Sequence, residues 1–284
     1  MRHACSLRIG PVGFRVGSVW AAPIAMLADL YRDYPRPEIA DFTVRLEATR
    51  PWRRWIRPAV RIGGDYMLPE AAPLPLAHAL LAAEMGMNLQ VALGSQRSLL
   101  LHAAAVERDG CALLISGQSG AGKSTLATLL AARGWRFMGD EFAMLDPDSG
   151  EVFAFPRLVS LKNDGIAAAT AAWPQARLGP ELAGTPKGTI RHLVPDARAI
   201  AAMDDPAMPV LLIFPRFGAA PAVRSMPASE AFVRLTQAST NYVALAERGF
   251  VCLTALARDV PAYAIDYPDG VAAVDQVEAL WRTL

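Results

Sequence analysis

The residues best suited to chemistry form a glycine-rich segment near the middle of the chain, Gly117-Gln-Ser-Gly-Ala-Gly-Lys-Ser124. This segment fits the pattern G-x-x-x-x-G-K-[S/T], in which glycines let successive backbone N–H groups point at phosphate oxygens. Lys123 supplies a compact charge for the β- and γ-phosphates, and the Ser124 hydroxyl supplies a ligand for Mg²⁺. The residues expected to contact the nucleotide are Gly117, Gln118, Ser119, Gly120, Ala121, Gly122, Lys123, Ser124 and Thr125, the last supporting the turn or the phosphates nearer the base. The segment predicts binding of a nucleoside triphosphate, ATP, with Mg²⁺.

Two predicted elements must hold this loop in place. The apolar run Cys111–Ser116 is typical of a buried strand, paired with a preceding strand over Leu99–Val106. A helix is expected from Lys123 to Arg133, ended by Gly134 at the position after the cap. Strand, loop and helix in this order are the context that the motif requires, and the helix N-terminus adds its positive end.

An acidic pair follows at the end of the next predicted strand, Trp135–Met138. In sheets of this kind, the carboxyl ends of strands face the ligand. Adjacent side chains of an extended strand point in opposite directions, so Asp140 and Glu141 are expected to divide two roles, one toward an acceptor and one toward the metal. The alternative is a pair of solvated turn acids.

Lysine is scarce in this chain. Of the 28 lysines and arginines, three are lysines: Lys123, Lys162 and Lys187. The last two are candidates for neutralising charge on a transferred phosphoryl group or for steadying an acceptor loop, with Asn163 and Arg191 as weaker partners. The alternative for each is an ordinary surface residue. His102 has no partner at ligand spacing, and a lone histidine is more often part of the core.

Composition sets the broad class. The 284 residues are 53% apolar, with 27 acidic and 28 basic side chains and a net charge of +1, which favours a globular protein over a nucleic-acid or anionic-membrane binder. No run of about 18 uninterrupted apolar residues occurs, and the N-terminus has no apolar segment before a cleavage site, so neither a membrane span nor a secretory signal is predicted. Three widely spaced cysteines fit neither a disulfide framework nor a zinc site, so we expect a cytoplasmic protein.

The chain divides by pattern into residues 1–97, a smaller mixed α/β region, and residues 98–284, which hold the loop. In the first part we expect strands around the Gly10-Pro11 turn, a helix over Trp20–Tyr34, a strand over Phe42–Glu47 and a helix over Leu76–Leu93. The segment Pro51–Pro58 interleaves tryptophan with arginine and could stack on a nucleic acid or pair with an acidic peptide. We favour the simpler interpretation that its tryptophans cover the core while its arginines face water.

Several of these segments resemble a known family. The run His102-Ala-Ala-Ala-Val, the loop, RGWRFMGDEFAMLDPDSG (Arg133–Gly150) and FPRLVSLKND (Phe155–Asp164) resemble the HPr kinase/phosphorylase-like kinases, and in particular the HPr-kinase-related kinase A subgroup. Similarity to this subgroup extends to TPKGTIRHLVP, IFPRF and NYVALAERGF further along the chain. Related members include the serine kinases of lasso-peptide biosynthesis.

The resemblance implies a P-loop kinase core of the HPr kinase/phosphoenolpyruvate-carboxykinase type and ATP-dependent phosphorylation of a serine in a peptide or small protein. It implies that Asp140 is the general base, that Glu141 occupies the position of a metal-associated acid, and that His102 lies near the reacting phosphates. It is also compatible with a homo-oligomer. The chain departs from HPr kinases at Val159–Asn163, where their metal-associated glutamate segment is missing. A second metal ligand and the reverse, phosphorolytic activity therefore do not carry over.

The sequence thus predicts a cytoplasmic serine kinase that uses ATP and Mg²⁺ and acts on a peptide or small protein. Two alternatives remain open at this point. One is a phosphotransferase that acts on a small molecule, and the other is a nucleotide-gated peptide-binding module with little catalysis.

Overall fold

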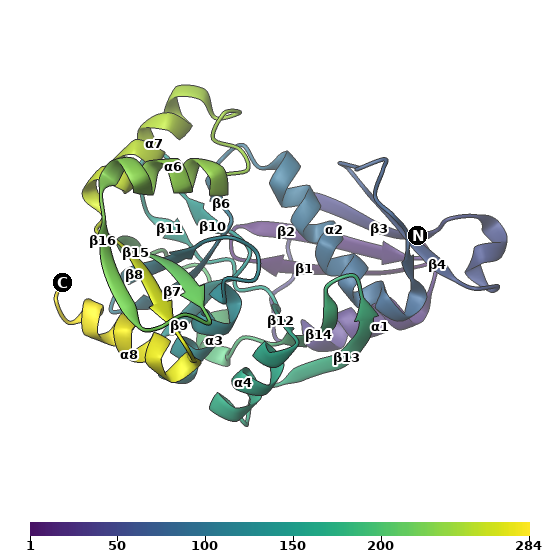
Figure 1. Cartoon of the computed structure of the whole chain (residues 1–284). Coiled ribbons are helices and arrows are strands. Elements are labelled where there is room, and N and C mark those ends of the chain that lie inside the picture. Colours follow the sequence, from purple (N-terminus) through teal and green to yellow (C-terminus); the bar gives the residue numbers. More distant parts are fainter. The chain divides into compact units, whose positions relative to one another are not determined.

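The computed structural model describes residues 1–284, and the chain folds as two compact units (Figure 1). The first comprises Met1–Ser95 with Leu182–Pro186, and the second comprises Gln96–Glu181 with Lys187–Leu284. Helices and four sheets alternate along the chain, so the expected mixed α/β class is confirmed.

The first unit is built on a five-stranded sheet in which sequence order and spatial order agree. The strands are β1 (His3–Ile9), β2 (Val12–Ser18), β3 (Phe42–Ala48), β4 (Ala59–Gly64) and β5 (Leu74–Pro75). The expected turn at Gly10-Pro11 is present, because Ile9 pairs with Val12 and Gly10 adopts φ 50°. Helix α1 (Ala21–Leu30) packs on β1 and β2 and ends earlier than the sequence predicted, while Tyr31 and Tyr34 are buried beyond its end.

The most apolar helical stretch belongs to this sheet. Residues Leu76–Gly94 form the short helix η2 (Leu76–His78) and the helix α2 (Ala79–Gly94), which packs on β3 and β4. This stretch has the length and composition of a membrane span, with a mean hydropathy of 1.2, although the sequence predicted none. Of its most apolar window, 61% is buried inside the structure, so packing within the unit accounts for much of its apolar character.

The tryptophan- and arginine-rich segment corrects one prediction. It forms the short helix η1 (Pro51–Arg54) and the turn after it, and Trp52 and Trp55 are 51% and 73% exposed. The expectation that these rings cover the core is therefore wrong. Arginine side chains lie over them instead, with Arg50 5.3 Å from the Trp52 ring centre and Arg54 5.4 Å from that of Trp55. The segment is tied down by a different aromatic residue, because Trp20 Nε1 donates to the carbonyl of Arg54.

The second unit is built on a six-stranded sheet with the order β16-β17-β15-β8-β7-β9. The strands are β7 (Ala103–Arg108), β8 (Cys111–Ser116), β9 (Arg136–Gly139), β15 (Met208–Phe217), β16 (Ala222–Met226) and β17 (Ala262–Tyr267). β8 and β17 run parallel to β15, while β7 runs antiparallel to both β8 and β9.

Alternate residues of these strands enter two separate cores. Leu113 and Ile115 pack with Leu126 and Leu130 of helix α3 (Lys123–Ala132), whereas Leu114 belongs to the core on the other face. Helix α8 (Gly270–Trp281) covers the first face, and helices α6 (Ala228–Ala238) and α7 (Ala246–Asp259) cover the second. The predicted positions of β8 and α3 agree with the structure to within one residue.

The strand expected over Leu99–Val106 is two strands in the structure. β6 (Leu99–Leu101) joins β10 (Ala143–Leu145) and β11 (Val152–Phe153) in a small sheet, and β7 enters the main sheet, so the chain changes sheets at His102. A third sheet, in the order β12-β14-β13, and two helices were not assigned from the sequence. These elements are β12 (Val159–Lys162), α4 (Asp164–Ala172), β13 (Leu178–Thr185), β14 (Gly188–Leu193) and α5 (Ala197–Ala201).

Candidate functional site

One edge of the six-stranded sheet collects the residues singled out in the sequence. β8 ends there at Ser116 before the glycine-rich loop, and β9, which runs in the same direction, ends there at Gly139 before Asp140. β7 lies between them in the opposite direction and begins there at Ala103, directly after His102. The topology therefore places the loop, Asp140 and His102 at the same end of three adjacent strands.

The loop between β8 and α3 adopts a backbone that only glycine accommodates without strain. Gly120 and Gly122 have φ of 87° and 93°, in the left-handed region. A Cβ on Gly120 would meet no atom within 4 Å, whereas one on Gly122 would lie 2.6 Å from the hydroxyl of Tyr267. Helix α3 starts at Lys123 without a side-chain cap, which leaves the N–H groups of its first turn available for an anion.

Lys123 is held against the loop that precedes it. Its ammonium donates to the carbonyl of Gly117 at 2.6 Å and to that of Gln118 at 3.1 Å. The residue is only 6% exposed, and burial lowers the pKa of the amine, an effect that the nearby Glu141 carboxylate opposes. A buried ammonium bonded only to main-chain carbonyls is a charge that anionic phosphate oxygens would satisfy better.

Tyr267 is a residue of the site that the sequence did not reveal. It ends β17, and its hydroxyl donates to the carbonyl of Ala121 at 3.2 Å. Burial raises the pKa of Tyr267 to about 12, so the hydroxyl keeps its proton at neutral pH and remains a donor. No sequence signal marks this contact, because the tyrosine comes from the far end of the chain and meets the loop only through the strand order.

Asp140 lies close to the start of the loop helix. The Ser124 side chain is near enough to its carboxylate to lower the pKa, and the N–H of Ser160 approaches the same carboxylate at 3.4 Å. Asp140 is 5% exposed, and burial, with a further contribution from Glu141, raises its pKa to about 7. The buried guanidinium of Arg157, which sequence reasoning also missed, opposes this shift.

His102 and Glu141 lie together at the same edge of the sheet. The His102 Nδ1 atom is 3.1 Å from the main-chain oxygen of Glu141 and 3.8 Å from its carboxylate. Burial is the main cause that lowers the pKa of His102, and the charges of Lys123 and Lys162 lower it further. Both side chains are more than a third exposed, so His102 is not enclosed in the core and faces the same site as the loop lysine.

The remaining candidates differ in what they contact. Lys162 ends β12 near both acids, and burial together with the charge of Lys187 lowers its pKa. Lys187 itself is exposed in the turn between β13 and β14. Asn163 and Arg191 form hydrogen bonds to main-chain groups next to them. Asn163 Oδ1 accepts from the Thr189 N–H at 3.1 Å, and Arg191 Nε donates to the carbonyl of Gly179 at 2.9 Å.

Thr125 and Ser124 lie side by side at the start of α3. The hydroxyl oxygen of Thr125 lies 2.8 Å from where a Cβ on Gly165 would be, so Thr125 lies against helix α4. No group of three or more histidine, cysteine or acidic side chains could hold a metal ion alone. Ser124 with one or two carboxylates is nevertheless the donor set that fits Mg²⁺ when phosphate oxygens and water complete its octahedron.

The similarity to known proteins found for this chain is structural and distant. No family model matches the chain, and no curated protein sequence matches it. Among solved structures, the chain is similar to the Hpr(Ser) kinase/phosphatase from Coxiella burnetii, with 16% sequence identity and a TM-score of 0.30 over 65% of this chain and 94% of that chain. A TM-score this low establishes no shared activity, so membership of the HPr-kinase-related subgroup stays a prediction and the function rests on the site itself.

Proposed function

We propose that this chain is an ATP- and Mg²⁺-dependent kinase that phosphorylates a serine hydroxyl in a peptide or small protein. The observation that carries the proposal is the position of Asp140: a buried carboxylate close to the serine of the glycine-rich loop, placed after β9 at the same edge of the sheet. A loop that only bound a nucleotide would not need Glu141 and Lys162 near this carboxylate, with His102 against Glu141.

The loop and its helix are suited to hold a triphosphate. The backbone N–H groups of the loop and the start of α3 face the phosphates, and Lys123 exchanges its carbonyl partners for phosphate oxygens. Ser124 and one acid of the pair, Glu141, would hold the metal. When bound, ATP supplies the phosphoryl group and Mg²⁺ offsets the negative charge that develops during transfer.

Asp140 and its neighbours are suited to the acceptor side. In this proposal the carboxylate of Asp140 accepts the proton of the serine hydroxyl as its oxygen bonds to the γ-phosphorus and the bond to the leaving diphosphate oxygen breaks. Glu141 lies on the metal side, as its place in the family pattern implies. Lys162, half-buried near both acids, adds positive charge where the phosphoryl group would pass.

The test compares Asp140→Asn with Asp146→Asn in the full chain, with labelled ATP and separate pools of peptides and metabolites. Asp146 belongs to an exposed turn in which it accepts from the Asp148 N–H, a bond that asparagine keeps. We expect Asp140→Asn to bind a fluorescent ATP analogue normally and to lose transfer by roughly 100-fold or more. Asp146→Asn should behave as the parent.

Each alternative gives a different result in this experiment. Normal transfer by Asp140→Asn would show that the proposed mechanism is wrong. Label that enters metabolites and never peptides would indicate a small-molecule phosphotransferase. ATP binding without transfer to either pool would indicate a nucleotide-gated binding module. Lys123→Ala should abolish transfer in both enzymatic cases and is the positive control for loss of phosphate binding.

We place this activity in the cytoplasm, with a peptide or protein partner and without a role in nucleic-acid binding. The near-zero net charge supports a partner recognised at a defined groove, because no general field would attract polyanions. The three cysteines are all free thiols, which is compatible with a reducing compartment.

A further inference from the structure

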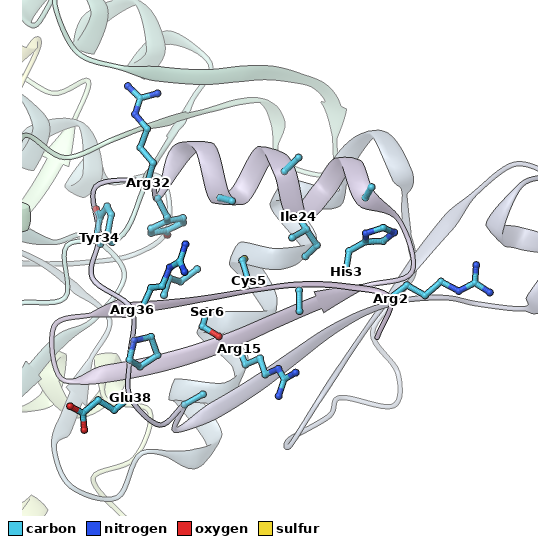
Figure 2. A pocket seen from close by; sticks show the side chains of 18 residues that line it. Arg2, His3, Cys5, Ser6, Arg15, Ile24, Arg32, Tyr34, Arg36 and Glu38 are labelled. Carbon is cyan, nitrogen blue, oxygen red and sulfur yellow. The ribbon is translucent and has the colours of Figure 1, made fainter.

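The first unit has a large cavity that the phosphate site does not explain. It has a volume of about 1070 Å³ and follows the outer edge of β1, beneath helix α1 (Figure 2). All residues from Arg2 to Leu7 line it, which means that both faces of the strand and the backbone between them border the cavity. β1 is the outermost strand of its sheet, so no strand lies beside this edge.

One hydrogen bond shows which main-chain groups of β1 point into the cavity. The Arg8 N–H donates to the carbonyl of Pro35 at 2.8 Å, so Arg8 faces away from β2. Alternate residues of an antiparallel strand face the same way. The N–H and C=O groups of Ser6 and Ala4, both exposed, therefore also point outward. The carbonyl of Pro35 thus pairs with Arg8 at the outer edge of β1, whereas the outward main-chain groups of Ser6 and Ala4 have no strand to pair with.

One face of this edge is basic. Ser6 pairs in register with Arg15 of β2, so Arg15 shares a sheet face with Ser6, Ala4 and Arg2. Figure 2 shows Ser6 and Arg15 on the side of β1 away from α1. Arg2, Arg15 and, from the loop, Arg36 are exposed, line the cavity and form no ion pair. The acid in the lining is Glu38, so the rim has an excess of positive charge.

The other face is apolar and has room for a backbone. His3 and Cys5 of β1 point toward α1, as Figure 2 shows. Across from them the helix presents small exposed residues, Ala21, Ala25 and Ala28, to the cavity. An added strand would therefore meet arginines on one face and a surface of small apolar side chains on the other.

We propose that the edge of β1 binds an extended peptide segment in which acidic residues alternate with apolar ones. The segment would extend the sheet as a sixth strand, pairing its backbone with Ala4 and Ser6. Its acidic side chains would face Arg2 and Arg15, and its apolar side chains would face α1. A second copy of this chain fits poorly here, because strand-to-strand pairing would bring two sets of these arginines together. The proposal concerns the first unit alone and does not depend on the proposed kinase activity.

The first test measures binding of short fluorescein-labelled peptides to the full chain by anisotropy. One peptide alternates glutamate with valine, and the matched peptide alternates lysine with valine. We expect the glutamate peptide to bind and Arg15→Glu to weaken it by about tenfold or more. The control variant is Arg57→Glu, which makes the same charge change at an exposed arginine of the first unit that does not line the cavity, and it should bind as the parent does. Equal losses in the two variants would overturn the proposal.

The second test examines the backbone. Hydrogen exchange at Ala4 and Ser6 should slow when the glutamate peptide is bound, and Ser6→Pro, which removes one outward N–H, should weaken binding by roughly tenfold. Circular dichroism shows whether Ser6→Pro is folded, and the exchange measurement on the parent does not depend on that variant. Three outcomes would overturn the proposal: unchanged exchange at both residues, tighter binding of an oligothymidine than of the peptide, or protection of these amides in a dimer without peptide.

Discussion

The side chain of Ser124 lies close to the carboxylate of Asp140 and opposes the rise in its pKa that burial causes. Ser124 belongs to the first turn of α3, which follows β8, and Asp140 follows β9; β7 lies between these two strands. Because Ser124 follows Lys123 directly, the protonation of Asp140 and the geometry of the loop are linked. The glycine-rich loop and the acidic pair therefore belong to one site.

Removing the charge of Asp140 should stabilise the protein in a pH-dependent way. Burial and Glu141 raise the pKa of this carboxyl to about 7 from 3.8, so between pH 4 and 7 the folded state binds a proton that the unfolded state has released. Stability therefore falls as pH rises through this window, and the full cost of the buried charge is present above pH 7. Asp140→Asn should match the parent near pH 4 and exceed it at pH 8 by on the order of 2–4 kcal/mol.

Urea denaturation without nucleotide or metal measures this difference. Metal ions must be removed with a chelator, because a bound cation would itself favour the ionised form of the Asp140 carboxylate. Asp146→Asn serves as the control, since it makes the same change at a half-buried turn carboxylate, keeps the bond from the Asp148 N–H, and should run parallel to the parent. Parallel curves for Asp140→Asn as well would show that its pKa is close to the ordinary value.

The two left-handed glycines of the loop should differ in their sensitivity to alanine. Both substitutions force a side chain into an unfavourable φ, but only a Cβ at Gly122 also meets the Tyr267 hydroxyl. We expect Gly120→Ala to cost about 1–2 kcal/mol and Gly122→Ala distinctly more. Tyr267→Phe should recover part of the Gly122→Ala loss and none of the Gly120→Ala loss. A double-mutant cycle by thermal unfolding measures the coupling, and equal costs at the two glycines would contradict the predicted contact.

The loop and its flanking elements were predictable because their sequence signals lie within one short stretch of the chain. The glycine spacing, the apolar run Cys111–Ser116 and the stop at Gly134 are all encoded within a few residues of one another. The contacts of Tyr267 and Arg157 depend on which strands become neighbours, and a single sequence does not specify that order. The elements between residues 159 and 201 were missed for a related reason, because short strands stabilised by pairing carry little periodicity of their own.

Two particular residues show the limits of pattern reading. His102 lies in a continuous apolar run, so the sequence suggested one strand, whereas the chain leaves one sheet and enters another there. Trp55 was expected to be buried on hydrophobicity alone, yet it is 73% exposed with an arginine over its ring. In both cases tertiary context decided the outcome, since the same residue types are compatible with either environment.

Lys162 should affect transfer more than nucleotide binding. It is half-buried near Asp140 and Glu141, whereas the loop lysine already contacts the part of the site that would hold the phosphates. We expect Lys162→Met to lower the rate of transfer by roughly 10- to 100-fold while the affinity for an ATP analogue changes little. Lys187→Met, at the exposed turn, should have a smaller effect. Single-turnover rates and separate binding titrations test this, and a loss of affinity as large as the loss of rate would argue against a role in transfer.

β9, the strand that precedes the acidic pair, is joined to β7 by a buried ion pair. Arg136 Nε donates to Glu107 at 2.5 Å, and both side chains are at most 7% exposed. Glu107 also accepts from the Gly110 N–H, and Arg136 also donates to the carbonyls of Ala202 and Asp205. Each charge is thus held by the other and by main-chain groups.

Removing one partner of this pair should cost far more than replacing both. Glu107→Ala leaves a guanidinium buried without its carboxylate, so we expect a loss of about 3–5 kcal/mol. Replacing both residues by methionine removes the two charges together and should restore much of that loss, although the carbonyls of Ala202 and Asp205 then lose their donor. Denaturant unfolding of the single and double variants measures the difference. A single variant as stable as the double variant would show that the pair is solvated and does not fix β9 against β7.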